Sequence, residues 1–128
     1  DLDKIGKIVS DLTNEGYLVI VSLHWGEEYE TSANDLQRNI ARTLIEAGVD
    51  LIVGHHPHVV QELEQYDDGW IAYSLGNFIF DQTFSVDTMR GAALRVELDE
   101  SNITDVTLVP VKISSDFQTS FAGSNIPQ

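Results

Sequence analysis

Four histidines are the residues of this sequence whose type and spacing could do chemistry: His24 stands alone, and His55, His56 and His58 form a cluster. Neutral imidazoles bind zinc, manganese, iron or nickel, and a chain without cysteine offers no thiolate to narrow that choice. Pro57 biases His56 toward an extended backbone, in which His56 and His58 point the same way, although a turn can also bring them to one ion. The spacing predicts a metal site with His55 in a supporting position. The alternative is that each histidine hydrogen-bonds only to the backbone of its own loop.

Both histidine groups follow segments that we expect to be parallel strands. Tyr17–Leu23 is apolar and rich in β-branched residues, which predicts a strand buried on both faces. Val49–Val53 predicts a second short strand, and residues 34–47 between them carry the apolar spacing of a helix. Strand, helix and strand make a βαβ unit, so the two strand ends should lie at the same edge of the sheet. We therefore expect the four imidazoles to converge there.

The remaining chain predicts an α/β fold with a mixed, layered sheet. Further elements are expected as a helix over 3–15 ending at Gly16, a hairpin of 59–66 with 70–74, and strands over 91–98 and 103–113. Ser32 and Asp35 resemble a capping box for the helix over 34–47, and Gly48 is expected to end it. The core should span about residues 4–113, with a frayed tail over 114–128 that is rich in Ser, Gln and Asn.

Three carboxylates and one amide lie where they could support the histidines. Glu27, Glu28 and Asp81 could supply oxygen ligands or orient an imidazole. Asn77 follows Gly76, a small residue that interrupts the strand pattern, and could offer its amide oxygen to a metal or its NH₂ to an anion. The alternative is that Gly76 and Asn77 form only a turn, with residues 78–80 in the core.

Composition disfavours several classes of partner. The chain has 128 residues, which suits one domain or part of one, and 21 acidic against 7 basic residues leave a net charge of −14. That charge disfavours binding to nucleic acid or to anionic membrane surfaces. The longest apolar run, Tyr17–Leu23, is far too short to span a membrane. Arg38, Arg42, Arg90 and Arg95 are too few and too scattered to predict a basic track.

Three segments carry a family resemblance. HWGEEY at 24–29, GHHPHVVQ at 54–61 and YSLGNFIFDQ at 73–82 resemble motifs of the CapA (PgsA) family of poly-γ-glutamate capsule-synthesis proteins. The resemblance implies a fold similar to the calcineurin-like metallophosphoesterases, an α/β sandwich that holds two metal ions at its strand ends. The Asp-x-His, Gly-Asp and Asn-His motifs with which that superfamily begins do not precede residue 24. The chain therefore resembles the C-terminal half of such a sandwich, and we expect it to be cut from a longer protein.

The resemblance implies roles for particular residues. His24, His56 and His58 match metal-ligating histidines, with His24 and His56 also expected at the catalytic centre. Glu28 and Asn77 lie inside the family's motifs and are inferred to support them. The metal would be Mn, Zn or Fe. Because a two-metal site draws ligands from both halves of the domain, we expect weak or absent metal binding and no efficient catalysis by this chain alone.

The resemblance also implies a function in poly-γ-glutamate capsule biosynthesis or export. The expected partners are components of the polymer's synthetase or the polymer itself, together with the missing N-terminal half of the domain. The family places the protein outside the cytoplasm, attached to the membrane through a region absent from this chain. Two alternatives are a metal-dependent phosphoester hydrolase in the intact protein, and a degenerate structural domain whose histidines bind nothing.

Overall fold

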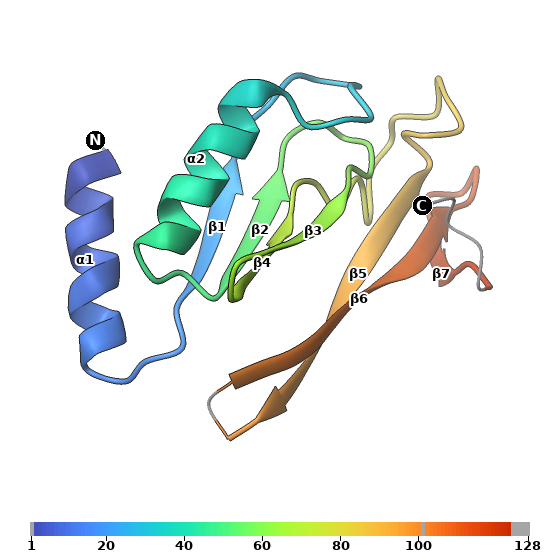
Figure 1. The fold of residues 1–128 in the computed structure, drawn as a ribbon. Helices are drawn as coiled ribbons and strands as arrows, with labels where there is room; N and C mark the ends of the chain where they lie inside the picture. The colour runs from blue at the N-terminus through green and yellow to red at the C-terminus, as the bar shows by residue number, and fades with distance from the viewer. Residues whose placement is uncertain (1, 101, 124–128) are drawn as a thin grey trace.

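The computed structural model describes residues 2–100 and 102–123, which form two helices and two sheets (Figure 1). The elements follow in the order α1 (Leu2–Asn14), β1 (Ile20–His24), α2 (Asp35–Glu46), β2 (Leu51–His55), β3 (Leu63–Tyr66), β4 (Gly69–Ala72), β5 (Arg90–Asp99), β6 (Asn102–Ile113) and β7 (Thr119–Phe121). The predicted α/β class with a mixed sheet is confirmed. Neither helix in the described ranges has the length and apolar character needed to cross a membrane.

The four-stranded sheet has the order β1-β2-β4-β3. β1 and β2 are parallel, and their register runs from Ile20 opposite Leu51 to His24 opposite His55. β4 lies parallel to β2 on its other side, and β3 forms an antiparallel hairpin with β4. The predicted βαβ unit and hairpin are confirmed, and the carboxyl ends of β1 and β2 lie side by side (Figure 1).

The prediction that β1 is buried on both faces is wrong. β1 is the outer strand of its sheet, and its side chains alternate between partly buried and exposed. Val21 and Leu23 pack against the core, whereas Ile20 on the other face is 56% exposed. Within the described residues only one face of this strand is covered. A continuous apolar run in the sequence therefore did not show whether the sheet is covered on one face or on both at this strand.

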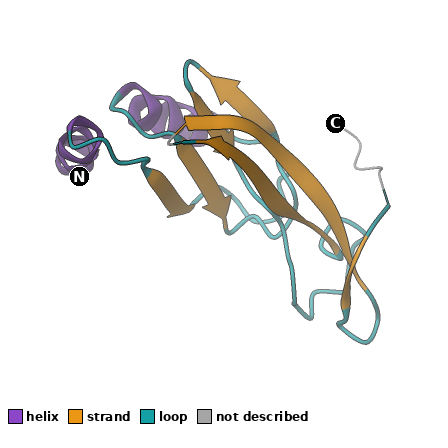
Figure 2. Cartoon of the chain, turned by 90° about the horizontal axis from the view of Figure 1, so that it is seen from below, coloured by secondary structure: helices purple, strands orange, loops and turns teal. Residues whose placement is uncertain are grey.

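The hydrophobic core lies between α2 and the four-stranded sheet. Ala41, Leu44 and Ile45 of α2 are buried and belong to one cluster with Ile52 of β2 and Ile71 of β4. Fully burying a leucine or isoleucine side chain contributes roughly 1.5–3 kcal/mol, so this layer supplies much of the free energy of folding. Figure 2 shows α1 beside α2 at one end of the molecule, with the β5–β6 ribbon running away from them.

α1 matches the helix predicted over 3–15, and the chain leaves it where Gly16 adopts a φ of +83°. Val9 is the buried residue of this helix, whereas Ile5 is 38% and Ile8 59% exposed. The helix thus contacts the rest of the described chain through a narrow strip of its surface.

α2 begins with a capping box, but not at the predicted residues. Asn34 is the N-cap: its side chain accepts a hydrogen bond from the Gln37 backbone N–H at 2.9 Å, and the Gln37 side chain accepts one from the Asn34 N–H at 3.1 Å. The prediction of Ser32 with Asp35 is wrong because the chain becomes helical only after Asn34. Gly48 follows the end of the helix as predicted, with a φ of +109°.

The second sheet has the order β5-β6-β7 and is antiparallel throughout. Its two long strands confirm the strands predicted over 91–98 and 103–113. The prediction of a frayed tail over 114–128 is wrong for Thr119–Phe121, because this segment pairs with the end of β6. Residues 124–128 of the predicted tail lie outside the described residues.

Candidate metal centre

The carboxyl ends of β1 and β2 bring the two histidine-bearing loops together. His24 and His55 are register partners at the last position of each strand, and the Trp25 N–H donates to the His55 carbonyl at 3.0 Å. The ring centroids of His24 and His56 lie 4.6 Å apart. Histidines from two distant parts of the sequence therefore meet at one edge of the sheet.

The loop after β2 turns sharply instead of continuing as an extended chain. His56 has a φ of +107° and His58 a φ of +61°, so the expectation that Pro57 holds His56 extended is wrong. A non-glycine residue at positive φ costs about 1–3 kcal/mol and persists only where its surroundings hold it. One such restraint comes from Tyr29, whose N–H donates to the Pro57 carbonyl at 2.8 Å. The turn leaves the ring centroids of His56 and His58 6.2 Å apart.

Glu28, His56 and His58 form the cluster of potential metal ligands. One carboxylate oxygen and one nitrogen from each imidazole all lie within 4.8 Å of one another. A carboxylate with two neutral imidazoles is a donor set that suits zinc, manganese or iron. Glu28 is exposed and both histidines are partly buried, so solvent reaches the cluster. Three protein ligands with an open side leave a coordination position for water or a substrate.

Asn77 determines which nitrogen of His58 is available to this cluster. The Asn77 NH₂ donates to the Thr88 carbonyl at 2.9 Å and to Gln82 Oε1 at 3.1 Å, which sets the orientation of the amide. Its Oδ1 then faces His58 Nδ1 at 2.8 Å and can only accept a hydrogen bond. A neutral His58 in this arrangement carries its proton on Nδ1, which leaves the lone pair of Nε2 free for a metal ion.

An aromatic and polar shell around His58 was not foreseen. The ring centroid of His58 lies 6.2 Å from that of Tyr29 and 5.0 Å from that of Phe80. The Tyr29 hydroxyl accepts a hydrogen bond from Gln82 Nε2 at 3.2 Å, so Gln82 joins Tyr29 to the amide that orients His58. The only signal for Tyr29 and Gln82 was their place inside the motif segments. The alternative that residues 78–80 belong to the core is wrong, because these side chains are between 42% and 70% exposed.

The other predicted site residues lie beside the cluster rather than in it. His24 lies next to His56 but is not one of the three mutually close ligands, so its ligation of a metal stays a prediction. His55 is exposed at the end of β2, and Asp81 is exposed in a later loop. Neither belongs to the cluster found among the described residues. Glu28 was expected either to supply an oxygen ligand or to support the histidines, and its position among the potential ligands favours the first of these roles.

The best-connected ion pairs lie away from the cluster, between α2 and β3. Arg42 pairs with Glu64 at 2.8 Å and Arg38 with Glu64 at 3.4 Å, and the Tyr73 hydroxyl donates to Glu64 at 2.8 Å. Burial by itself would raise the pKa of Glu64, but the Tyr73 hydrogen bond and the two guanidinium groups outweigh it and hold that pKa below its ordinary value. Burial, followed by the Glu64 carboxylate, raises the pKa of Tyr73. Arg38 and Arg42 thus serve the contact between helix and sheet.

Comparison with known proteins shows which sequences this chain resembles. Residues 1–82 match the model of the family described as "Bacterial capsule synthesis protein PGA_cap". "PGA biosynthesis protein CapA" of Bacillus subtilis is 40% identical over 119 residues, covering 84% of this chain and 31% of that protein. "Capsule biosynthesis protein CapA" of Bacillus anthracis is 39% identical over 112 residues, covering 88% of this chain and 27% of that protein. A "Probable polyglutamine synthesis accessory protein" of Mycobacterium tuberculosis is 33% identical over 81 residues, covering 62% of this chain and 20% of that protein. The chain spans less than a third of the length of each of these relatives.

Proposed function

The chain belongs to the PGA_cap family of bacterial capsule synthesis proteins, and from this premise we propose that it acts in the synthesis or export of a poly-γ-glutamate capsule through a divalent-metal site. Glu28, His56 and His58 would hold the ion, with His24 beside them. The observation that carries the metal site is the convergence of these ligand atoms within 4.8 Å at the ends of two parallel strands. The names of the relatives from two Bacillus species support the capsule role.

The donor set fits such an ion chemically. A bound divalent metal would supply Lewis-acid chemistry at this edge of the sheet. The residues of this chain prepare the position: the turn at Pro57 aims His56 and His58, and Asn77 holds the proton of His58 on Nδ1. Indirect partners of this kind, which orient a metal-binding imidazole through its other nitrogen, are typical of protein metal sites.

The metal site can be tested by calorimetric titration of Zn²⁺ and Mn²⁺ into this chain. We expect weak but saturable binding, because only part of the domain's ligands is present. His56→Ala should weaken it by about 100-fold or more because it removes a ligand, and His24→Ala by about 10–100-fold, the loss typical of an indirect partner. His55→Ala is the matched control, since His55 is adjacent in sequence but lies outside the cluster. Equal weakening by His55→Ala, or no saturable binding by the intact protein, would contradict the assignment.

A metal-dependent phosphoester hydrolase is the second candidate function, and the exposure of Glu28 favours it. An open ligand cluster leaves room for a substrate, which a closed structural metal site would not. His24, which lies beside the three ligands, could then protonate the leaving group. The test is hydrolysis of an aryl phosphate by the intact protein, which His24→Ala or His56→Ala should abolish. Activity retained in both variants would exclude this role for the histidines.

The setting of the whole protein follows from the same proposal. We expect the intact protein to work outside the cytoplasm, held at the membrane by a region not present in this chain, beside components of the polymer's synthetase. A strain that lacks the intact protein should lose production of poly-γ-glutamate. Unchanged production in that strain would contradict the capsule role.

A further inference from the structure

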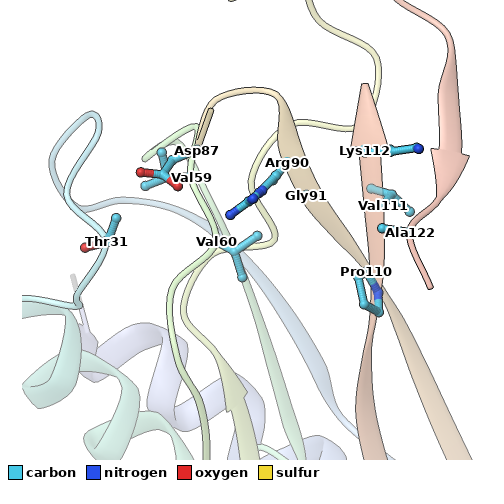
Figure 3. A pocket seen from close by; sticks show the side chains of 10 residues that line it. All are labelled: Thr31, Val59, Val60, Asp87, Arg90, Gly91, Pro110, Val111, Lys112 and Ala122. Carbon is cyan, nitrogen blue, oxygen red and sulfur yellow. The ribbon is translucent and has the colours of Figure 1, made fainter. Parts of the chain in front are cut away.

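A cavity of about 340 Å³ lies between the chain that follows His58 and the β5–β6 ribbon (Figure 3). Val59 and Val60 line one side, and Pro110 and Val111 of β6 line the other. These side chains give the cavity predominantly apolar walls. Its residues are distinct from the ligand cluster, although Val59 directly follows His58 in the chain.

Two positive charges border this cavity. Arg90 and Lys112 both line it and are register partners on β5 and β6. Within residues 2–100 and 102–123 neither side chain takes part in an ion pair, whereas Arg38, Arg42 and Arg95 each pair with glutamates. Asp87, the one acidic residue among the described residues that line the cavity, is paired with neither cation, so the cavity keeps a local excess of positive charge in a chain whose net charge is −14.

The two cations point in different directions. Figure 3 shows the Arg90 guanidinium extending toward Val60, while the Lys112 amine points away from Arg90. Two cations that chelate one small anion must converge on it, and these two diverge. Cations that diverge from adjacent backbone positions can instead contact two different carboxylates spaced along one chain. Between them, the apolar walls suit the methylene groups that separate such carboxylates.

We propose that this cavity binds a segment of a carboxylate-bearing peptide chain, with Arg90 and Lys112 each contacting a carboxylate. The planar guanidinium of Arg90 can take a carboxylate through two parallel hydrogen bonds. Thr31 and Asp87, which also line the cavity, offer oxygen acceptors for the amide N–H groups of such a chain. That the chain is poly-γ-glutamate rests on the proposed function; that it carries carboxylates rests on the cavity.

The net charge of −14 does not prevent this binding. At physiological ionic strength the Debye length is about 8 Å, so exposed acidic residues farther away than this are largely screened. Charges in direct contact with a bound carboxylate are screened much less. The two cations at the cavity therefore dominate the interaction at short range, while the overall charge slows the approach of a polyanion.

The test is calorimetric titration of a γ-linked glutamate decamer into the 128-residue chain, with EDTA present so that no metal contributes. We expect Arg90→Gln to weaken binding by at least about tenfold, the loss of one charge-assisted hydrogen bond, and Lys112→Gln to weaken it as well. Arg95→Gln is the matched control, because Arg95 lies on the same strand but pairs with Glu97 and does not line the cavity. It should change binding less than twofold, a shift typical of exposed ion pairs.

The outcomes separate this proposal from the capsule role. Decamer binding that falls in Arg90→Gln and not in Arg95→Gln supports the site. Equal affinities for a neutral glutamine decamer, or equal effects of the two arginine variants, would overturn it. An α-linked glutamate decamer is the second probe. If only this peptide binds, and its binding depends on Arg90, the cavity is a site for a carboxylate-bearing chain, but poly-γ-glutamate is not its occupant. The metal titration tests the histidine cluster separately, because it does not involve the cavity.

Discussion

Replacing Asn77 tests whether its hydrogen bond keeps His58 in the tautomer that can bind a metal ion, or whether Asn77 only stabilises the fold. Asn77 is only 5% exposed and makes three hydrogen bonds: to His58 Nδ1 at 2.8 Å, to the Thr88 carbonyl at 2.9 Å and to Gln82 Oε1 at 3.1 Å. Asn77→Ala removes all three. It therefore acts on the fold and on the tautomer of His58 together, and a second variant must separate the two effects.

The cost to folding follows from these contacts. Leaving the buried Thr88 carbonyl without its donor costs about 1–3 kcal/mol, and the lost hydrogen bond to His58 adds about 1 kcal/mol. We expect Asn77→Ala to lower the free energy of unfolding by about 2–4 kcal/mol. Asn77→Asp keeps an acceptor for His58 but places a carboxylate oxygen against the Thr88 carbonyl, so this variant should lose a similar amount of stability.

Metal binding should distinguish the two variants. Asn77→Ala leaves His58 free to exchange tautomers, and we expect Zn²⁺ affinity to fall by about 10–100-fold. Asn77→Asp still accepts from Nδ1 and should retain the affinity of the unaltered chain within a few-fold. ¹⁵N NMR of the histidine side chains reads the tautomer directly and without metal: the Nδ1-protonated form of His58 should dominate in the unaltered chain and in Asn77→Asp, but not in Asn77→Ala.

A matched control is Asn39→Ala, since Asn39 is exposed on α2 and far from these hydrogen bonds in sequence. It should leave both the tautomer and the affinity unchanged. The reasoning is refuted if Asn77→Ala unfolds more easily yet keeps both the Nδ1-protonated His58 and its Zn²⁺ affinity. It is equally refuted if Asn77→Asp loses as much affinity as Asn77→Ala, because the acceptor would then not matter.

Two further predictions concern the fold. Gly54→Ala should prevent folding or lower the free energy of unfolding by more than about 3 kcal/mol, because its Cβ would overlap the Tyr73 carbonyl. Gly123→Ala is the control: no heavy atom lies within 4 Å of the added Cβ, so the free energy of unfolding should not change. Equal thermal unfolding of the two variants would contradict the close approach at Gly54. The pKa of Glu64 is lowered in the fold, so its stabilising effect is full above the unfolded pKa of about 4.3 and is lost as the pH falls through its folded pKa. The stability difference between the unaltered chain and Glu64→Gln, measured by urea unfolding, should therefore be largest near neutral pH and should shrink as the pH falls below the unfolded pKa. A pH-independent difference would count against the pairing with Arg42.

Much of the topology could be read from the order of local patterns. Two apolar runs with a helix between them predicted the parallel pair β1 and β2, and the hairpin predicted for 59–66 with 70–74 corresponds to β3 and β4. These patterns are informative because consecutive strands and helices are usually joined by short connections and lie next to each other in space. Burial was less predictable, because the exposure of Ile20 depends on which strand lies at the edge of the sheet.

The candidate site also has features that the sequence predicted and features that it did not. That His24 and His56 should approach each other followed from the sequence, since the carboxyl ends of neighbouring parallel strands meet wherever a short crossover joins them. The hydrogen bonds to Asn77 and Tyr29 did not follow, because they join residues far apart in the sequence.

The sequence by itself determined the kinds of chemistry open to this chain: imidazole and carboxylate ligands, no thiolate, and an overall acidity that disfavours nucleic acid. It also determined the family, because three ordered motifs carry enough information to identify it. Only the tertiary structure decided that Glu28 lies among the potential ligands, that Asn77 Oδ1 faces His58 Nδ1, and that Arg90 and Lys112 both line one cavity. The physical reason is that donor type is a property of a residue, whereas distance, tautomer and local charge are properties of the residues that folding places around it.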